Sequence, residues 1–155
     1  RERHQHARHL QRGAAFGVAH DDYTGGDIIA KMQSANDEIL LIAQIETERG
    51  LENVDAIAAV DGIDVLWIGH FDLTNFMGIP GQFTSDAYLA AVKRVIAACE
   101  KHGKVAGIMV GDTATGQAML DQGFRAIAYS GDLWIYQQAL REGISALREM
   151  ASGQS

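Results

Sequence analysis

Two nearly continuous apolar segments, each followed by an acidic residue, constrain this sequence more than any other feature. The first, ILLIAQIET, covers residues 39–47, and the second, VLWIGHFDLT, covers residues 65–74. Apolar runs of this kind are typical of strands that are buried on both faces of a parallel sheet. The runs lead to carboxylates at Glu46 and Asp72. Because ligands bind at the carboxyl ends of parallel strands, these two acids are predicted to lie at a functional site.

Other strand-like segments occur along the chain. GAAFGV, at residues 13–18, predicts a strand or an extended loop that ends in the polar cluster HDDY. KVAGIMV, at residues 104–110, and RAIAYS, at residues 125–130, predict two further strands. The segment 70–83 contains the single proline, Pro80, and is predicted to be an ordered loop over a strand end.

Segments with helical periodicity alternate with the strands. Asp27 and either Thr84 or Ser85 are placed to cap two of these helices, and Gly103 is placed to end one. The predicted helices cover residues 27–36, 48–60, 85–102, 113–122 and 132–150. This alternation predicts βα units and a parallel α/β sheet.

The chain length limits how many βα units are present. A complete (β/α)₈ TIM barrel takes about 250 residues, whereas this sequence has 155. The chain is therefore either a small open α/β domain or a portion of a barrel. We divide it into a basic arm at residues 1–12, an α/β domain at residues 13–150 and a short tail at residues 151–155.

Charge and composition narrow the possible partners and the compartment. The formal net charge of −7 argues against nucleic acid or an anionic membrane surface as the main partner. Cys99 is the single cysteine, which excludes an internal disulfide and favours a reducing cytoplasm. No apolar stretch reaches the roughly 18 residues of a membrane span. The basic arm lacks the apolar centre of a secretion signal, and the spacing of its histidines indicates a solvated arm rather than a metal site.

Glu46 and Asp72 have two possible roles. If their strands are neighbours, the two carboxylates can share a hard cation such as Mg²⁺ or Mn²⁺, but each acid can equally well cap the helix that follows. Gln44 lies two residues before Glu46 and therefore points to the same side of the strand, either toward a ligand or into a polar layer inside a barrel. His70 is either an acid–base group or a structural histidine.

The segment from Gln44 to Phe83, QIETERGLENVDAIAAVDGIDVLWIGHFDLTNFMGIPGQF, resembles the HpcH/HpaI family of class II pyruvate-dependent aldolases. GAAFGVAHDDY and KVAGIMV also occur in the order that this family shows, so the resemblance extends over residues 12–150. It implies that the chain corresponds to the C-terminal half of a (β/α)₈ barrel. It also implies a lyase that binds a divalent metal and releases pyruvate and an aldehyde from 4-hydroxy-2-oxo acids.

The resemblance implies roles for particular residues. Glu46 and Asp72 match the metal-binding carboxylates, for Mg²⁺, Mn²⁺ or Co²⁺, and Gln44 matches the amide near the pyruvate. Phe71 and Asp72 occupy the turn whose backbone N–H groups hold the pyruvate carboxylate, although Phe71 is larger than the residue expected there. Met109 matches a strand position that lines the pocket.

The sequence departs from the family in its first half. The early barrel strands, which in relatives carry the base histidine with its aspartate partner and an arginine that binds the oxo-acid, have no counterpart here. His20 and His70 do not match the position of that base. Two hypotheses follow: a second chain or an N-terminal segment completes an active aldolase, or the chain is a non-catalytic fragment or interaction module that retains the metal and oxo-acid site. Open sheet edges and the apolar side of the last helix predict a homo-oligomer under either hypothesis.

Overall fold

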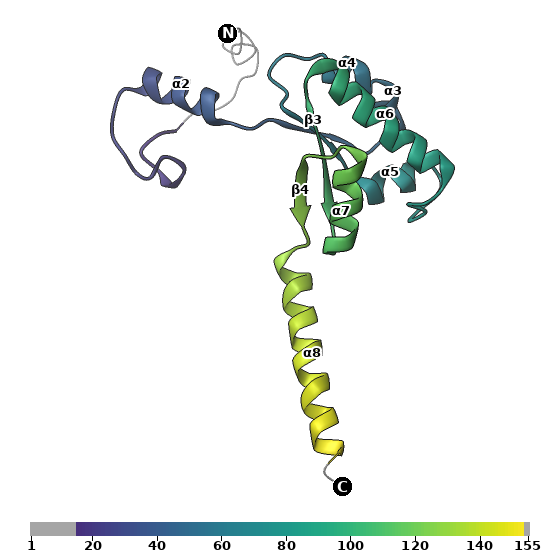
Figure 1. The fold of residues 1–155 in the computed structure, drawn as a ribbon. Helices are drawn as coiled ribbons and strands as arrows, with labels where there is room; N and C mark the ends of the chain where they lie inside the picture. The colour runs from purple at the N-terminus through teal and green to yellow at the C-terminus, as the bar shows by residue number, and fades with distance from the viewer. Residues whose placement is uncertain (1–14, 154–155) are drawn as a thin grey trace.

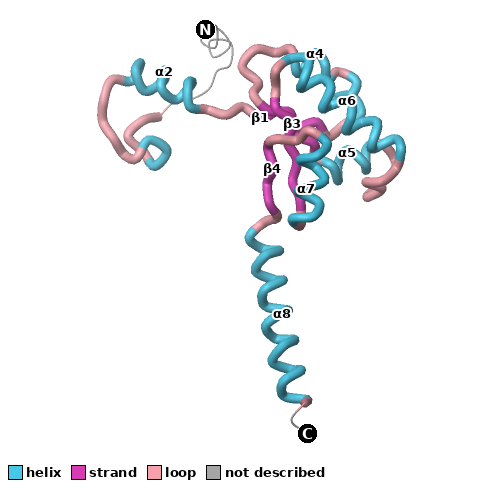
Figure 2. Tube along the Cα trace, viewed as in Figure 1, coloured by secondary structure: helices cyan, strands magenta, loops and turns pink. Residues whose placement is uncertain are grey.

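The computed structural model describes residues 15–153, which fold around a parallel sheet (Figures 1 and 2). Within these residues the sheet has four strands in the order β1-β2-β3-β4, and each strand pairs in parallel with the next one along the chain. The strands are β1 (Ile42–Ile45), β2 (Val65–Ile68), β3 (Val105–Val110) and β4 (Ala126–Tyr129). The predicted parallel α/β architecture is confirmed.

Helices connect the strands and extend beyond the sheet at both ends. In chain order they are η1 (Ala19–Asp21), α2 (Ile28–Glu38), α3 (Glu48–Glu52), α4 (Val54–Ala58), α5 (His70–Phe76), α6 (Asp86–His102), α7 (Thr113–Gln122) and α8 (Asp132–Ser152). The helices α3 to α7 gather beside the sheet, whereas α2 and α8 project away from it in different directions (Figure 1).

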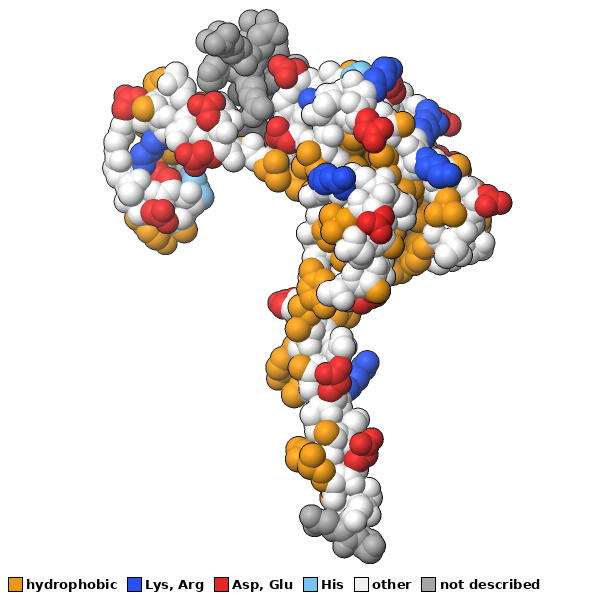
Figure 3. All heavy atoms as spheres, in the orientation of Figure 1, with side chains coloured by type: hydrophobic (Ala, Val, Ile, Leu, Met, Phe, Trp, Pro, Cys, Tyr) orange, Lys and Arg blue, Asp and Glu red, His pale blue; other side chains and the backbone are white. Residues whose placement is uncertain are grey.

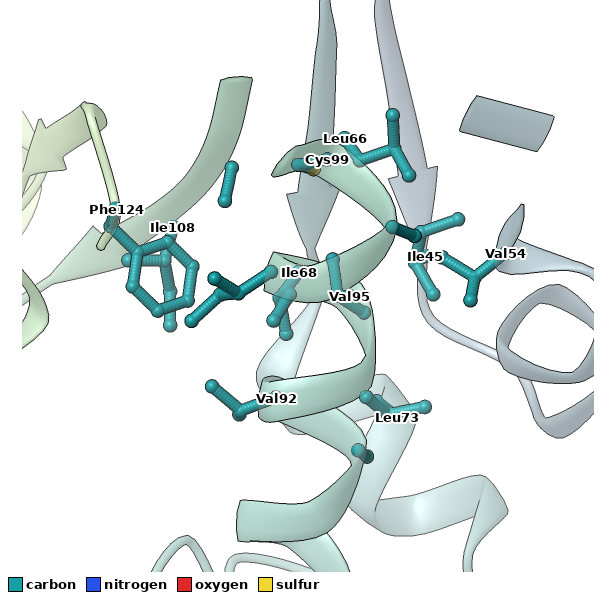
Figure 4. Close-up of a cluster of buried hydrophobic side chains, with 14 of the residues drawn as sticks. Ile45, Val54, Leu66, Ile68, Leu73, Val92, Val95, Cys99, Ile108 and Phe124 are labelled. Atoms are coloured by element: carbon teal, nitrogen blue, oxygen red, sulfur yellow. The ribbon is translucent and has the colours of Figure 1, made fainter. Parts of the chain in front are cut away.

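The core lies between the sheet and α6. Ile45 pairs with Ile68, and Ile68 pairs with Ile108, so that three isoleucines form a row across the strands. All three side chains are buried, together with Val95 of α6 and with Phe124, which precedes β4 (Figure 4). Burial of this apolar surface is the main source of stability in a domain of this kind.

Local signals in the sequence set the ends of several helices. The Asp27 carboxylate accepts a hydrogen bond of 2.8 Å from the Ala30 N–H at the start of α2. The Ser85 hydroxyl accepts one of 3.3 Å from the Tyr88 N–H at the start of α6. Gly103 ends α6 with φ of 64°, a left-handed conformation that favours glycine. These three predictions are confirmed.

The prediction of a loop over residues 70–83 is wrong for its first half, which forms α5. Leu73 and Thr74 are fully buried, and the Thr74 hydroxyl donates hydrogen bonds to the carbonyls of His70 at 2.9 Å and Phe71 at 3.0 Å. Gly78, Pro80 and Gly81 all follow the end of this helix. These three residues therefore mark only the loop that follows α5.

The first apolar run is less buried than its composition predicts. Ile39, Leu40 and Leu41 precede β1 and are exposed, as is Ile42. By contrast, Val65, Leu66 and Ile68 of β2 are buried. The two segments differ in exposure because β1 is an edge strand of this sheet, whereas β2 has a neighbouring strand on both sides. Residues 15–18, the described part of GAAFGV, form a loop before η1 and not a strand.

The structure describes only part of the predicted arm, domain and tail. Residues 1–12, which we assigned to a basic arm, lie outside the described residues. Helix α8 continues to Ser152, so it includes the first residues of the predicted tail. None of the described helices combines the length and the apolar character that crossing a membrane requires.

Candidate active site

The carboxyl ends of β1 and β2 lie side by side and bring Gln44 and Glu46 together. Ile45 accepts a hydrogen bond of 3.1 Å from the N–H of Gly69, and the Gln44 amide nitrogen donates a hydrogen bond to Oε2 of Glu46. A Cβ atom on Gly69 would lie 2.8 Å from Nε2 of Gln44 and 2.9 Å from Cβ of Glu46. Gly69 is therefore required at this position, because any side chain would displace the two polar groups.

The structure bears on the alternative that Glu46 is only a helix cap. The N-cap of α3 is Thr47, whose hydroxyl accepts a hydrogen bond of 3.0 Å from the Gly50 N–H. Glu46 is half-buried and precedes this cap, so its carboxylate is available for another purpose. Asp72 lies in the first turn of α5, where a negative charge also stabilises the helix, and its side chain is exposed.

Gln44 and Met109 lie on the same face of the sheet. Gln44 pairs with Trp67, and Trp67 pairs with Gly107, so these positions form one row. Met109 follows Gly107 by two residues and therefore points to the same side, opposite to the buried row of isoleucines. The structure thus places Gln44, Glu46 and Met109 on the face of the sheet that the helices leave open.

Trp67 also shapes this open face, a role that was not predicted from the sequence. Its indole ring lies across Gly107, where an added Cβ atom would be 2.5 Å from a carbon of the ring. A glycine in the interior of a strand often marks such a close approach, so Gly107 within KVAGIMV was the available signal. Trp67 is half-buried and stands beside Gln44 in the register.

His70 and Phe71 belong to an aromatic cluster beside Asp72. The ring centroids of His70, Phe71 and Phe83 lie 4.7, 5.1 and 5.2 Å from one another, and Phe83 also contacts the buried ring of Tyr88 at 5.7 Å. Burial lowers the pKa of His70, and the nearby charge of Asp72 opposes this shift only in part. The lowered pKa favours the neutral imidazole of His70. Phe71 is the exposed ring of the cluster.

His20, the other histidine considered as a base, lies in a different part of the molecule. It belongs to η1, which precedes α2 in the segment that stands off from the sheet (Figure 1). Its ring contacts Phe16 at a centroid distance of 6.2 Å. The structure does not bring His20 to the carboxyl ends of β1 and β2.

The side chains predicted to bind a metal carry oxygen donors, the kind that a hard divalent cation prefers. Glu46 and Asp72 offer carboxylate oxygens and Gln44 offers an amide oxygen, and these oxygen ligands suit Mg²⁺ or Mn²⁺ better than a soft metal. Among residues 15–153, no group of three or more His, Cys, Asp or Glu side chains is placed to hold a metal ion. A cation at this site would therefore keep several water ligands, which Mg²⁺ commonly does.

Comparison with known proteins identifies the family. The model of the family described as HpcH/HpaI aldolase/citrate lyase matches residues 3–139. The chain belongs to the HpcH/HpaI family. It is 35% identical over 137 residues to a hydroxypyruvate/pyruvate aldolase of Paraburkholderia phytofirmans, covering 88% of this chain and 49% of that protein. It is 36% identical over 129 residues to a 4-hydroxy-2-oxovalerate aldolase of Novosphingobium aromaticivorans, covering 83% of this chain and 49% of that protein.

Solved structures of the HpcH/HpaI family show the same arrangement. A family member from Burkholderia cenocepacia superposes with a TM-score of 0.78 at 33% identity, over 88% of this chain and 52% of that one. An HpcH/HpaI aldolase from Desulfitobacterium hafniense gives a TM-score of 0.77 at 29% identity, over 90% of this chain and 54% of that one. The chain spans about half the length of the curated relatives it matches, and its sheet is a partial α/β barrel.

Proposed function

We propose that this chain carries the metal-binding and oxo-acid-binding half of a divalent-metal-dependent carbon–carbon lyase. The reaction would cleave a 4-hydroxy-2-oxo acid into pyruvate and an aldehyde. The observation that carries the proposal is the packing of Gly69 against Gln44 and Glu46, which holds two oxygen-bearing side chains at the strand ends just before Asp72. The aldolase names of the relatives support the same class of reaction.

The residues of the site have separate roles in this proposal. Glu46 and Asp72 would hold Mg²⁺ or Mn²⁺, with Co²⁺ as a possible substitute, and the bound cation would neutralise the negative charge that develops on the pyruvate enolate. Gln44 would donate its amide hydrogen bond to the oxo-acid, and the backbone N–H groups of Phe71 and Asp72 would bind its carboxylate. Met109 would contact the substrate from the neighbouring strand.

A pair of glutamate variants tests the proposal. Glu46→Gln keeps the size of the side chain but removes a charged ligand, whereas Glu48→Gln makes the same change in an exposed residue of α3. We expect Glu46→Gln to weaken binding of Mn²⁺ by at least about tenfold and to abolish metal-dependent pyruvate release, and Glu48→Gln to change neither. Calorimetry measures the first quantity and a coupled pyruvate assay the second. Unchanged metal affinity in Glu46→Gln would rule out the proposed site.

A second candidate function is a non-catalytic module that retains the metal and oxo-acid site. It is favoured by the absence, near Glu46 and Asp72 in the described part of the chain, of a histidine placed as the family's base. Metal binding that Glu46→Gln removes, without pyruvate release from the wild-type chain, would support this second function over the first.

The proposal includes self-association and a cytoplasmic setting. Helix α8 exposes large apolar side chains along its length (Figure 3), namely Leu133, Trp134, Ile135, Leu140, Ile144, Leu147 and Met150. Strands β1 and β4 also form edges of the sheet, and unpaired strand edges favour association. We therefore propose a homo-oligomer. The net charge of −7 supports the prediction of no nucleic-acid or membrane partner, and the single cysteine, which is buried, suits the cytoplasm.

A further inference from the structure

A cavity of about 170 Å³ lies on the helix-covered side of the sheet, at the carboxyl end of β3. Its floor is formed by residues 108–111, and its walls come from the start of α5, the loop before α6, α6 itself and α7. Ile108 and Val110 in this floor belong to the buried face of the sheet. Gln44 and Glu46 lie on the open face and do not line this cavity, whereas His70 and Met109 of the candidate active site do.

The walls of the cavity favour an aromatic ligand. His70, Phe83 and Tyr88 line one end, and Phe83 meets both of the other rings edge-on, at centroid distances of 5.2 and 5.7 Å. Met119 adds a thioether and Leu89 an aliphatic wall. Ring edges and thioether sulfurs both make favourable contacts with an aromatic ring, beyond the effect of burying its surface.

One polar group in the wall can recognise a substituent on the ring. The Thr115 hydroxyl donates a hydrogen bond of 2.9 Å to Oδ2 of Asp112. Because the hydroxyl proton is used in this bond, the Thr115 oxygen can accept a hydrogen bond from a ligand. A hydroxyl on the ligand would satisfy that oxygen.

We propose that this cavity binds a single-ring phenol. An apolar protein cavity of about 150 Å³ accommodates benzene, so the present volume suits one six-membered ring with one small substituent. Drug-sized ligands occupy pockets of about 300–1,000 Å³, so a ligand of two rings is too large. Phenol binding in this cavity would require neither metal nor pyruvate. It would be a separate property from the lyase function proposed above.

Binding can be measured by NMR on the metal-free 155-residue chain with ¹³C-labelled methionine methyl groups. We expect phenol to shift the Met119 methyl signal saturably, with a dissociation constant of about 1 mM. Cyclohexanol, which has the same hydroxyl and a ring of the same size, should bind roughly two- to tenfold more weakly because it lacks aromatic contacts. Absence of a saturable shift with phenol, or equal affinities for the two probes, would overturn the proposal.

Two leucine variants locate the bound phenol. Leu89→Trp fills the cavity from its rim, whereas Leu120→Trp makes the same change on α7 outside the cavity, at a residue of similar exposure, 40% against 37%. We expect Leu89→Trp to abolish the shift and Leu120→Trp to leave it intact. Persistence of binding in Leu89→Trp, or equal loss in both variants, would contradict this location.

A third variant keeps the test informative if Leu89→Trp does not fold. Thr115→Val preserves the shape of the side chain and removes the acceptor oxygen, so it should weaken phenol binding by about fivefold or more. It should leave the affinity for benzene unchanged. Because no metal is present in these titrations, their result is independent of whether the lyase activity is found.

Discussion

Helices α6 and α8 have the same kind of sequence and opposite surroundings. Both are long, with 17 and 21 residues, and both carry apolar side chains along one side. Seven residues of α6 are buried, including Val92, Val95 and Cys99, whereas none of the residues of α8 is buried against the described chain. Periodicity therefore determines where a helix forms, whereas burial depends on whether a neighbouring surface is present.

Removing one isoleucine side chain from each helix should produce the largest difference in the free energy of unfolding. Ile96 of α6 is 9% exposed and Ile144 of α8 is 47% exposed. Ile96→Ala should lower the free energy of unfolding by about 2–5 kcal/mol, because it leaves a cavity in the core, and Ile144→Ala by less than about 0.5 kcal/mol in the monomer. Urea denaturation at low protein concentration measures both values. A cost for Ile144→Ala equal to that for Ile96→Ala would mean that α8 is packed in solution.

Two glycine substitutions should change stability in opposite directions. Gly107→Ala forces a methyl group against the Trp67 ring and should cost about 1–3 kcal/mol, with a shift in tryptophan fluorescence. Gly143 lies inside α8 with nothing within 4 Å of an added Cβ atom, so Gly143→Ala should stabilise the helix by about 0.5–1 kcal/mol. Destabilisation by Gly143→Ala would indicate that a partner approaches α8 closely at that point.

Self-association should depend on the apolar side of α8. Leu140→Glu places a charge among the exposed apolar residues of this helix and should weaken association by at least about tenfold. Sedimentation velocity over a range of protein concentrations measures the change. Ser145→Glu adds the same charge on the side of α8 that faces away from Leu140 and Leu147, and it serves as the control. An oligomer that tolerates Leu140→Glu would have to form through the sheet edges.

A smaller effect, of pH on local stability, is expected around η1, where Asp21 links Gly17 to Lys31 of α2. The Asp21 carboxylate accepts hydrogen bonds from the N–H of Gly17 at 2.8 Å and from the ammonium of Lys31 at 2.7 Å. These bonds lower the pKa of Asp21 from 3.8 to about 2. Because the folded value is below the unfolded one, the stabilisation is present above about pH 4 and is lost as the pH falls toward 2.

Amide hydrogen exchange at Gly17 and Val18 measures this pH dependence. Asp21→Asn should abolish the acid-induced loss of protection, and Asp22→Asn, a change in the neighbouring carboxyl, should preserve it. Protection that stays constant between pH 5 and 2 in the wild-type chain would show that the carboxylate of Asp21 does not hold this segment.

The periodic parts of the fold were predictable from the sequence. The strands at 65–68 and 105–110 and the helix at 86–102 combine strong apolar patterns with clear caps, and local propensity agrees with the final packing there. The short helix α5 was missed because Gly78, Pro80 and Gly81 follow it closely and dominate the local signal. The exposure of Ile39 to Ile42 was not predictable, since it depends on which strand lies at the edge of the sheet.

The candidate site was predictable to a smaller extent. The alternation of side chains along the first strand placed Gln44 and Glu46 on one side, and the structure agrees. The contact of Gly69 with both residues and the contact of Trp67 with Gly107 depend on strand register, which no local pattern specifies. The metal-binding roles of Glu46 and Asp72 come from the family resemblance and remain predictions.

The order of the strands has a consequence for how the chain folds. Every strand pairs with the next one in the sequence, so the sheet can grow in one direction as the polypeptide leaves the ribosome. The pairing of β2 with β3 closes the longest loop, because Val65 meets Val105 across α5 and α6. Loop closure of this length carries the largest entropic cost. Docking of α6 is therefore expected to be the slow event in synthesis, after which β4 can join without delay.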